Sequence, residues 1–421
     1  MLNARVNAVV ALAPDLESQW RASAQRLATS QPRSLLEGVP IVVKDNILVK
    51  GMPCTWGSRL FKDYLPERDE VAVERLRAAG AIVVGKTNVP EFTLEGYTGN
   101  ALFGVTRNPW DPSLTPGGSS GGSVAAVAAG LVPLALGTDG GGSIRRPASH
   151  TGLVGLKPSI GAVPRVHMLP AILLDLEVVG PIGATVADVS RLFDVISASP
   201  PREAKARPRV LHVARFGEAP LDPEIASSVN DAVSRLAGLG CEVEAGNLPI
   251  DLAPLEAFWP KFAAAGVAWL MSLHPGKEAL LGERMQAMLE QGRAVSAAQY
   301  IDGLALMHRM RHEAQALFSR YDFVLTPSAA ALPWRAEAPW PETIDGKRVG
   351  PRGHAVYTAW VNACGIPAIS LPCAPSRAGL PIGFQLVGGF GADRALLDMA
   401  ARYEAAHPWA RPLDPRLRAS A

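Results

Sequence analysis

Residues 37–85 limit the fold more than any other part of the sequence. The valine- and isoleucine-rich run VPIVV at 39–43 is typical of a buried strand. DEVAVERLRAAG at 69–80 places its apolar residues on one helical stripe, with Asp69 at its start and Gly80 at its end. AIVVG follows at once as a second strand. This strand–helix–strand alternation predicts an α/β fold, in which helices cover a sheet.

The alternation continues along the chain. Residues 123–131 are apolar on every side and predict a buried helix that Pro133 ends, before a strand at PLALGTD. Residues 199–207 read as a surface crossing, and strand, helix and strand patterns follow it. Residues 252–320 read as mostly helical, and three more strand-like runs and a helix follow. We therefore expect one compact α/β unit with a helical excursion and no repeats.

Composition excludes several classes of protein. Hydrophobic residues make up 48% and charged residues 19%, which is too apolar for a disordered chain. The net charge of +2 gives no reason to expect a nucleic-acid partner. No apolar stretch is long enough to span a membrane, and the N-terminus shows no clear signal-peptide cleavage pattern. The four cysteines lack C-x-x-C pairing, as in reduced proteins, so we expect a cytoplasmic protein without a membrane partner.

Residues 137–148, GTDGGGSIRRPA, contain three consecutive glycines followed by a serine and are a candidate functional loop. A phosphate-binding loop would end in Gly-Lys-Ser/Thr, which is absent, and a flexible linker would not follow an apolar strand directly. Glycines let backbone N–H groups approach a reacting carbonyl without obstruction. We therefore predict an oxyanion hole formed by the N–H groups of Gly140, Gly141, Gly142 and Ser143, with Ser143 as the nucleophile.

A serine nucleophile needs a base, and histidine is the usual one. None of the eight histidines lies in a distinctive setting; His308 and His312 are four residues apart but lack the glutamate of a zinc-protease motif, so we expect a solvated helix face and no metal. Lys44 ends the apolar run VPIVV. Burial would lower the pKa of this lysine and make it a base, whereas at an exposed strand end it would pair with an acid such as Asp45.

A second glycine–serine cluster lies at 115–123, TPGGSSGGS. Residues 117–121 match the G-x-S-x-G pattern of a hydrolase nucleophile elbow, which requires a strand directly before it. The preceding NPWDPSLTP contains three prolines and cannot form a buried strand, so we reject that match. The flanking glycines still indicate a close backbone approach.

Taken in order, these motifs resemble the amidase signature family of serine hydrolases. The resemblance covers nearly the whole chain and includes L-x-G-V-P-x-x-V-K-D-N at 36–46 and G-x-P-C-T-x-G-S at 51–58. It continues through GAIVVGKTNVPEF, TRNPWDPSLTPGGSSGGS, LGTDGGGSIRRPAS and LPIGFQLVG. It implies one domain over 1–421, built on a single large mixed sheet covered by helices on both faces. Its core is expected at 30–200 and 320–410, and a divergent, mostly helical, substrate-shaping region at about 205–320.

The resemblance also assigns roles to particular residues. Ser143 takes the place of the nucleophile, Ser119 that of a bridging serine whose peptide bond is cis, and Lys44 that of the base. Neutral Lys44 would accept a proton through Ser119 as Ser143 attacks an amide, and water would later cleave the acyl-enzyme. Asp139 and Arg145 match positions that support the loop in the family. No cofactor is implied.

Two departures from the family pattern bear on the substrate. Gly140 replaces the usual threonine or isoleucine, which would loosen the oxyanion hole. Arg146 stands where many members carry an uncharged residue, and in some relatives an arginine here binds a substrate carboxylate. We place Arg146 and Ser120 among the substrate-binding residues; the alternative for Arg146 is a structural arginine.

The expected function is hydrolysis of an amide bond in a small molecule. Which amide is cleaved does not follow from the sequence, because the selecting residues lie in the divergent region. Alternatives are the glutaminase A subunit of a tRNA-dependent amidotransferase, a carboxylesterase, and a catalytically silent binding protein. Intact Lys44, Ser119 and Ser143 disfavour the last. The sequence leaves a homodimer open.

Overall fold

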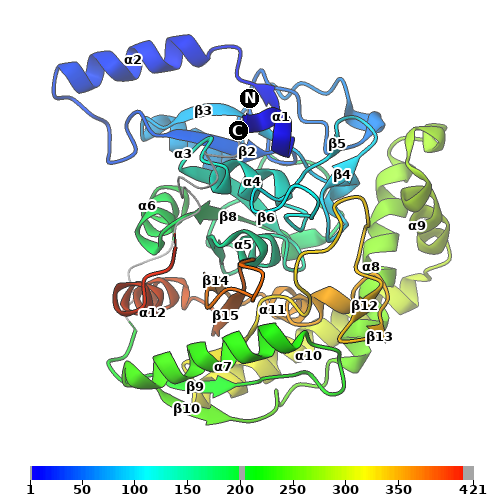
Figure 1. Cartoon of the computed structure of the whole chain (residues 1–421). Helices are drawn as coiled ribbons and strands as arrows, with labels where there is room; N and C mark the ends of the chain where they lie inside the picture. The colour runs from blue at the N-terminus through cyan, green and yellow to red at the C-terminus, as the bar shows by residue number, and fades with distance from the viewer. Residues whose placement is uncertain (1, 199–203, 411–421) are drawn as a thin grey trace.

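The computed structural model describes residues 2–198 and 204–410, and within them one mixed sheet holds eleven strands (Figure 1). In order across the sheet these are β1 (Val9–Leu12), β3 (Ile82–Thr87), β2 (Pro40–Lys44), β6 (Leu134–Asp139), β8 (Val178–Gly183), β7 (Val154–Lys157), β14 (Ala368–Pro372), β15 (Gly383–Gly388), β11 (Phe323–Pro327), β9 (Arg209–His212) and β10 (Glu242–Ala245). β3, β2 and β6 run parallel, as do β11, β9 and β10, whereas the neighbouring pairs from β6 to β11 are antiparallel. The predicted α/β fold with one large mixed sheet is confirmed.

Helices pack on both faces of this sheet. One face carries α3 (Val71–Ala78), α6 (Val186–Ile196), α7 (Pro223–Gly238) and α12 (Asp393–Ala406). The other face carries α1 (Leu2–Val6), α4 (Gly121–Ala128) and α5 (Arg145–Thr151), and further along it α8 (Ala253–Ser272), α9 (Glu283–Arg293), α10 (Ala297–Arg320) and α11 (Ala359–Ala363). α2 (Leu16–Ala28) extends from the body at the N-terminal end, as Figure 1 shows.

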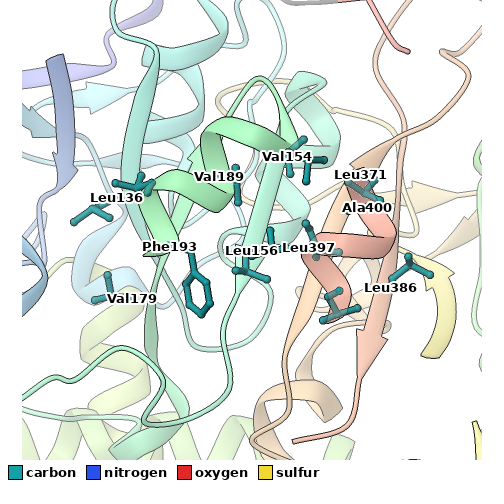
Figure 2. Close-up of a cluster of buried hydrophobic side chains, with 14 of the residues drawn as sticks. Leu136, Val154, Leu156, Val179, Val189, Phe193, Leu371, Leu386, Leu397 and Ala400 are labelled. Atoms are coloured by element: carbon teal, nitrogen blue, oxygen red, sulfur yellow. The ribbon is translucent and has the colours of Figure 1, made fainter. Parts of the chain in front are cut away.

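Alternating side chains explain why both faces are apolar. Ile41 and Val43 of β2 point into one core, whereas Val42 between them joins the core on the opposite face. This period of two is the geometry of a strand, so a continuous apolar run serves a sheet buried on both sides. Figure 2 shows the first core, where Phe193 of α6 and Leu397 of α12 pack against the sheet.

Short elements complete the fold. These are the hairpins β4 (Gly99–Asn100) with β5 (Gly104–Val105) and β12 (Thr343–Ile344) with β13 (Lys347–Arg348), and a 3₁₀ turn η3 (Leu174–Leu176) before β8. Within the described residues, no helix is both long and apolar enough to cross a membrane. The four cysteines are all free thiols.

The structure corrects several local predictions. α3 begins at Val71, because the carboxylate of Asp69 accepts from the Lys50 N–H and pairs with Arg77 instead of capping the helix. α4 ends at Ala128, before Gly130 turns the chain at φ +71°, so Pro133 does not end it.

Further findings concern longer segments. β1 forms between the two N-terminal helices α1 and α2 and pairs with β3 at the edge of the sheet. Strands β9 and β10 form where strand patterns were expected after residue 207 and join the main sheet, and the helices α8 to α10 follow them. Of the predicted surface crossing at 199–207, residues 199–203 lie outside the described residues.

Candidate active site

The candidate site lies where two parallel neighbours in the sheet end. Lys44 is the last residue of β2, and Asp139 is the last residue of β6. Residues 41–43 pair in register with residues 134–136, so the carboxyl ends of both strands reach the same edge of the sheet. Consequently Lys44 lies beside Thr138, which is 94 residues later in the sequence.

Lys44 is completely buried and contacts a serine of the second glycine cluster. Its Nζ lies 2.8 Å from Ser119 Oγ, and it lies 2.8 Å from the Oγ1 and 3.1 Å from the carbonyl oxygen of Thr138. Burial lowers the pKa of Lys44 to about 7, although the charges of Glu177 and Asp139 act in the opposite direction. An amine that is largely neutral near pH 7 can accept a proton, so Lys44 has the properties of a base.

Ser119 and Ser143 come from the two glycine-rich loops. The Gly118–Ser119 peptide bond is cis, as the family resemblance implies. The loops are joined by the Ser120 N–H, which donates to the Ser143 carbonyl at 3.1 Å. Within the described part of the chain the Ser143 hydroxyl makes no hydrogen bond, and it faces a large cavity. The structure thus joins Lys44 to Ser119 and leaves Ser143 free to meet a substrate.

The loop after β6 presents backbone donors to that cavity. Gly140, Gly141 and Ser143 line it, and among the described residues their N–H groups have no hydrogen-bond partner. The prediction is wrong for Gly142, because its N–H donates to Asp139 Oδ1 at 2.7 Å. The remaining three donors suit an oxygen that acquires negative charge when Ser143 attacks.

At each position of the glycine run 140–142, a side chain would be too close to a neighbouring residue. Gly142 adopts φ +111°, and a Cβ there would lie 2.3 Å from Thr358 Oγ1. A Cβ on Gly141 would lie 3.1 Å from the ring of Trp259. A Cβ on Gly140 would lie 2.8 Å from Leu173, so the Leu173 side chain fills the space beside this glycine. The run is therefore held closely by neighbouring side chains.

Asp139 and Arg145 flank this loop, as the last residue of β6 and the first residue of α5. Asp139 accepts from the N–H groups of Gly142 and Ile144 and pairs with Arg145 at 2.9 Å. Arg145 also donates to the Asn362 side chain at 2.6 Å and to the carbonyl of Thr358. The Arg145 charge and these donors hold the pKa of Asp139 below its usual range despite burial. The pair ties the loop to α11.

Three side chains beside Lys44 were not predicted from the sequence. Thr138 Oγ1 lies 2.8 Å from both Lys44 Nζ and Glu177 Oε1, and the Asn46 amide donates to Thr138 and Glu177. Thr138 and Asn46 belong to the quoted motifs GTDGGGS and VKDN, so their proximity to the site could have been inferred. Glu177 follows η3 in a segment without a motif, and no local signal marks it.

The cavity in front of Ser143 has a volume of about 1170 Å³. Arg146, which is 4% exposed, reaches it and donates to the carbonyls of Gly118 and Gly142 at 3.3 Å. Arg352 lies 5.4 Å from the ring of Trp259 in the same cavity. Within the described residues neither arginine pairs with a carboxylate. Burial, together with the charge of Arg352, lowers the pKa of Arg146 to about 9.

Other predicted residues lie elsewhere. Ser120 is fully buried away from the cavity lining and donates to the Thr138 carbonyl at 3.0 Å, so its prediction as a substrate contact is wrong. His150 is buried beside Trp334 with a pKa lowered to about 4 by burial, which makes it a poor base. His308 and His312 are exposed on α10, as predicted.

α5 begins at Arg145 and has only seven residues. Residues 106–116 before the rejected G-x-S-x-G match form no strand. No group of three or more metal-ligating side chains occurs among the described residues.

Known proteins share this architecture. The A subunit of glutamyl-tRNA(Gln) amidotransferase from Symbiobacterium thermophilum is 36% identical, over 97% of this chain and 91% of the relative. The solved structure of a bacterial aryl acylamidase matches with a TM-score of 0.88 at 28% identity, covering 97% of this chain and 90% of that one. For 6-aminohexanoate cyclic dimer hydrolase in complex with its substrate the TM-score is 0.86 at 28% identity, covering 98% and 92%.

The match extends to a family model described as Amidase, which covers residues 1–397. It therefore includes both glycine loops, the strand that ends at Lys44 and the C-terminal strands of the sheet. The chain belongs to the amidase signature family of hydrolases.

Proposed function

We propose that this protein hydrolyses the amide bond of a small molecule through an acyl-enzyme on Ser143. The observation that supports this most is the buried contact of 2.8 Å between Lys44 Nζ and Ser119 Oγ. Ser143, the proposed nucleophile, lines the cavity. A lysine with a pKa of about 7 supplies the base that the histidines do not.

The proposed reaction has two halves. In the first, Ser143 Oγ bonds to the amide carbon while its proton moves to Ser119 Oγ and the Ser119 proton moves to Lys44. The N–H groups of Gly140, Gly141 and Ser143 stabilise the oxyanion. The proton returns through Ser119 to the leaving nitrogen as the C–N bond breaks. In the second half, water attacks the ester carbon and its proton moves through Ser119 to Lys44. The ester C–O bond then breaks, the proton returns to Ser143 Oγ and the carboxylic acid is released.

Labelling with a fluorophosphonate tests this function directly. The adduct should map to Ser143 by mass spectrometry, and Ser143→Ala should prevent it. The rate of labelling should rise with pH through about 7, because Lys44 must lose a proton to act as the base. Labelling at Ser119 or Ser120, or a rate that falls as the pH rises, would contradict the proposal.

The substrate that we propose is a small amide bearing a carboxylate. Arg146 and Arg352 reach the cavity and neither forms an ion pair among the described residues, although the charge of Glu256, which also lines the cavity, acts on Arg352. A buried arginine is stabilised when it binds an anion such as a carboxylate. A charge-assisted contact is worth about 1.5–3 kcal/mol, or roughly 10- to 150-fold in kcat/KM.

A pair of substrates separates charge recognition from loop support. Arg146→Gln should lower kcat/KM for the carboxylated amide by at least about 10-fold and leave the neutral amide of equal size nearly unchanged. Equal losses on both substrates would show that Arg146 supports the Gly118 and Gly142 backbone instead. A wild-type preference for bulky neutral amides would contradict the proposed substrate.

A glutaminase is the second candidate, because several relatives at 31–36% identity are the A subunits of amidotransferases. Glutamine is itself a small amide with a carboxylate, so the same arginines would suit it. Release of ammonia from glutamine only after a second subunit co-purifies would favour this candidate. Esters offered beside amides in the same assay would reveal a carboxylesterase.

A further inference from the structure

Glu177 stands next to the catalytic lysine although no motif marks it. One of its oxygens, Oε1, lies 2.8 Å from Thr138 Oγ1 and accepts from the Asn46 amide at 3.0 Å. Its other oxygen, Oε2, lies 3.4 Å from Arg165, which in turn pairs with Glu70. The carboxylate is thus fixed between Arg165 on one side and Thr138 on the other.

The position of the carboxylate decides where the Thr138 proton goes. A hydroxyl has one proton to donate, whereas an ionised carboxylate can only accept. The Thr138 O–H therefore donates to Glu177 at 2.8 Å. Its oxygen is then left to accept, from Asn46 at 3.1 Å and from Lys44 at 2.8 Å.

The same count applies to the amine of Lys44. A neutral amine has two N–H groups and one lone pair. One N–H donates to the Thr138 carbonyl at 3.1 Å, which can only accept, and the other donates to Thr138 Oγ1. The lone pair is then directed at the remaining neighbour, Ser119 Oγ, at 2.8 Å. This is the orientation in which Lys44 can take the Ser119 proton.

We infer that Glu177 is a positioning residue for catalysis, because by accepting the Thr138 proton it directs the lone pair of Lys44 at Ser119. The inference rests on the proposed function, in which Lys44 is the base. Without Glu177, the other acceptor for the Thr138 hydroxyl is Asn46 Oδ1, at the longer distance of 3.4 Å. The hydroxyl would then be less firmly held and free to donate to the lone pair of Lys44 instead.

Glu177 also acts on Lys44 through its charge. The charged groups that influence Lys44 are Glu177 and Asp139, which raise its pKa, and Arg165 and Arg146, which lower it. Glu177 has the largest effect of the four. Removing its charge should therefore move the acid limb of the pH–rate profile to lower pH, a change that a purely structural residue would not cause.

Fluorophosphonate labelling of Ser143 in the full-length protein, followed against pH, measures both effects without a known substrate. Glu177→Gln keeps the size and removes the charge, and its acid-limb midpoint should fall by about one pH unit. Thr138→Val keeps the β-branched shape within β6 and removes the hydroxyl, and its plateau rate should fall by about 100-fold. Thr138→Ser should restore the plateau. Asp175→Asn is the matched control, because Asp175 lies exposed in η3 and, among the described residues, its one ion pair is with Arg311.

The outcomes are separable. An unmoved midpoint in Glu177→Gln, or a Thr138→Val plateau within about twofold of wild type, would overturn the positioning role. If Glu177→Gln does not fold because it loses the ion pair with Arg165, the plateau labelling rates of Thr138→Val and Thr138→Ser are compared instead. Equal rates in these two variants would overturn the positioning role. If the wild-type protein is not labelled at Ser143 at all, the proposed function fails, and not this inference alone.

Discussion

Replacing Lys44 by methionine should make the fold more stable near neutral pH while it destroys activity. Methionine has a similar length and no charge, so it fills the same fully buried site without the cost of desolvating an amine. The variant also loses the hydrogen bonds of Lys44 to Thr138 and Ser119, a loss that does not depend on pH. The pH dependence therefore isolates the amine.

The magnitude follows from the pKa. In the unfolded chain Lys44 is protonated up to about pH 10.5, whereas in the folded protein its pKa is lowered to about 7. Between these values the unfolded chain binds the extra proton, so wild-type stability rises with pH by up to about 1.4 kcal/mol per pH unit. The cost of keeping Lys44 is full below pH 7, at about 5 kcal/mol, and vanishes near pH 10.5.

Urea unfolding of both proteins, followed by tryptophan fluorescence from pH 6 to 10, measures this difference. Lys157, whose pKa is also lowered to about 7 by burial, is present in both proteins and cancels. The free energy of unfolding of wild type minus that of Lys44→Met should be flat below pH 7 and rise above it. A difference that stays constant from pH 7 to 10 would refute the neutral buried amine, and with it the assignment of the base.

Three further predictions concern the loop and the chemistry. Ser119→Ala should fold normally and lower the rate of Ser143 labelling by at least about 100-fold, measured by mass spectrometry, because it removes the hydroxyl that contacts Lys44 Nζ and carries the proton in the proposed reaction. Gly142→Ala should lower both the melting temperature and the labelling rate, because the added Cβ would clash with Thr358. Gly161→Ala is the control for backbone strain alone, because Gly161 also has a positive φ, +81°, but no atom lies near its Cβ position. Dialysis against a strong chelator should leave the labelling rate unchanged, since the described residues contain no cluster of metal ligands; a loss reversed by zinc would contradict a serine mechanism.

Local patterns in the sequence were enough to predict the α/β class, whereas the single large mixed sheet was expected only from the family resemblance. A continuous Val/Ile run such as residues 39–43 has both side-chain phases apolar, which only a strand buried on both faces requires. The order of the glycine loops indicated the family, and the position of Lys44 after such a run suggested a desolvated amine. These inferences hold because burial on both faces requires a run of apolar residues and close backbone approaches require glycine, and both patterns can be seen in residues adjacent in the sequence.

Tertiary structure decided the rest of the site. Glu177 and Arg352 lie in segments whose local sequence has no periodicity or motif that points to the cavity, and only the packing of β8 and of the 350–355 loop brings them there. The same holds for the contradicted residues. The sequence suggested that Gly142 and Ser120 were free to bind a substrate. In the structure, however, the Gly142 N–H donates to the Asp139 carboxylate and the Ser120 hydroxyl donates to the Thr138 carbonyl, and each donor has one proton to give. Which donors remain free for a substrate depends on partners that are close in space and not in sequence.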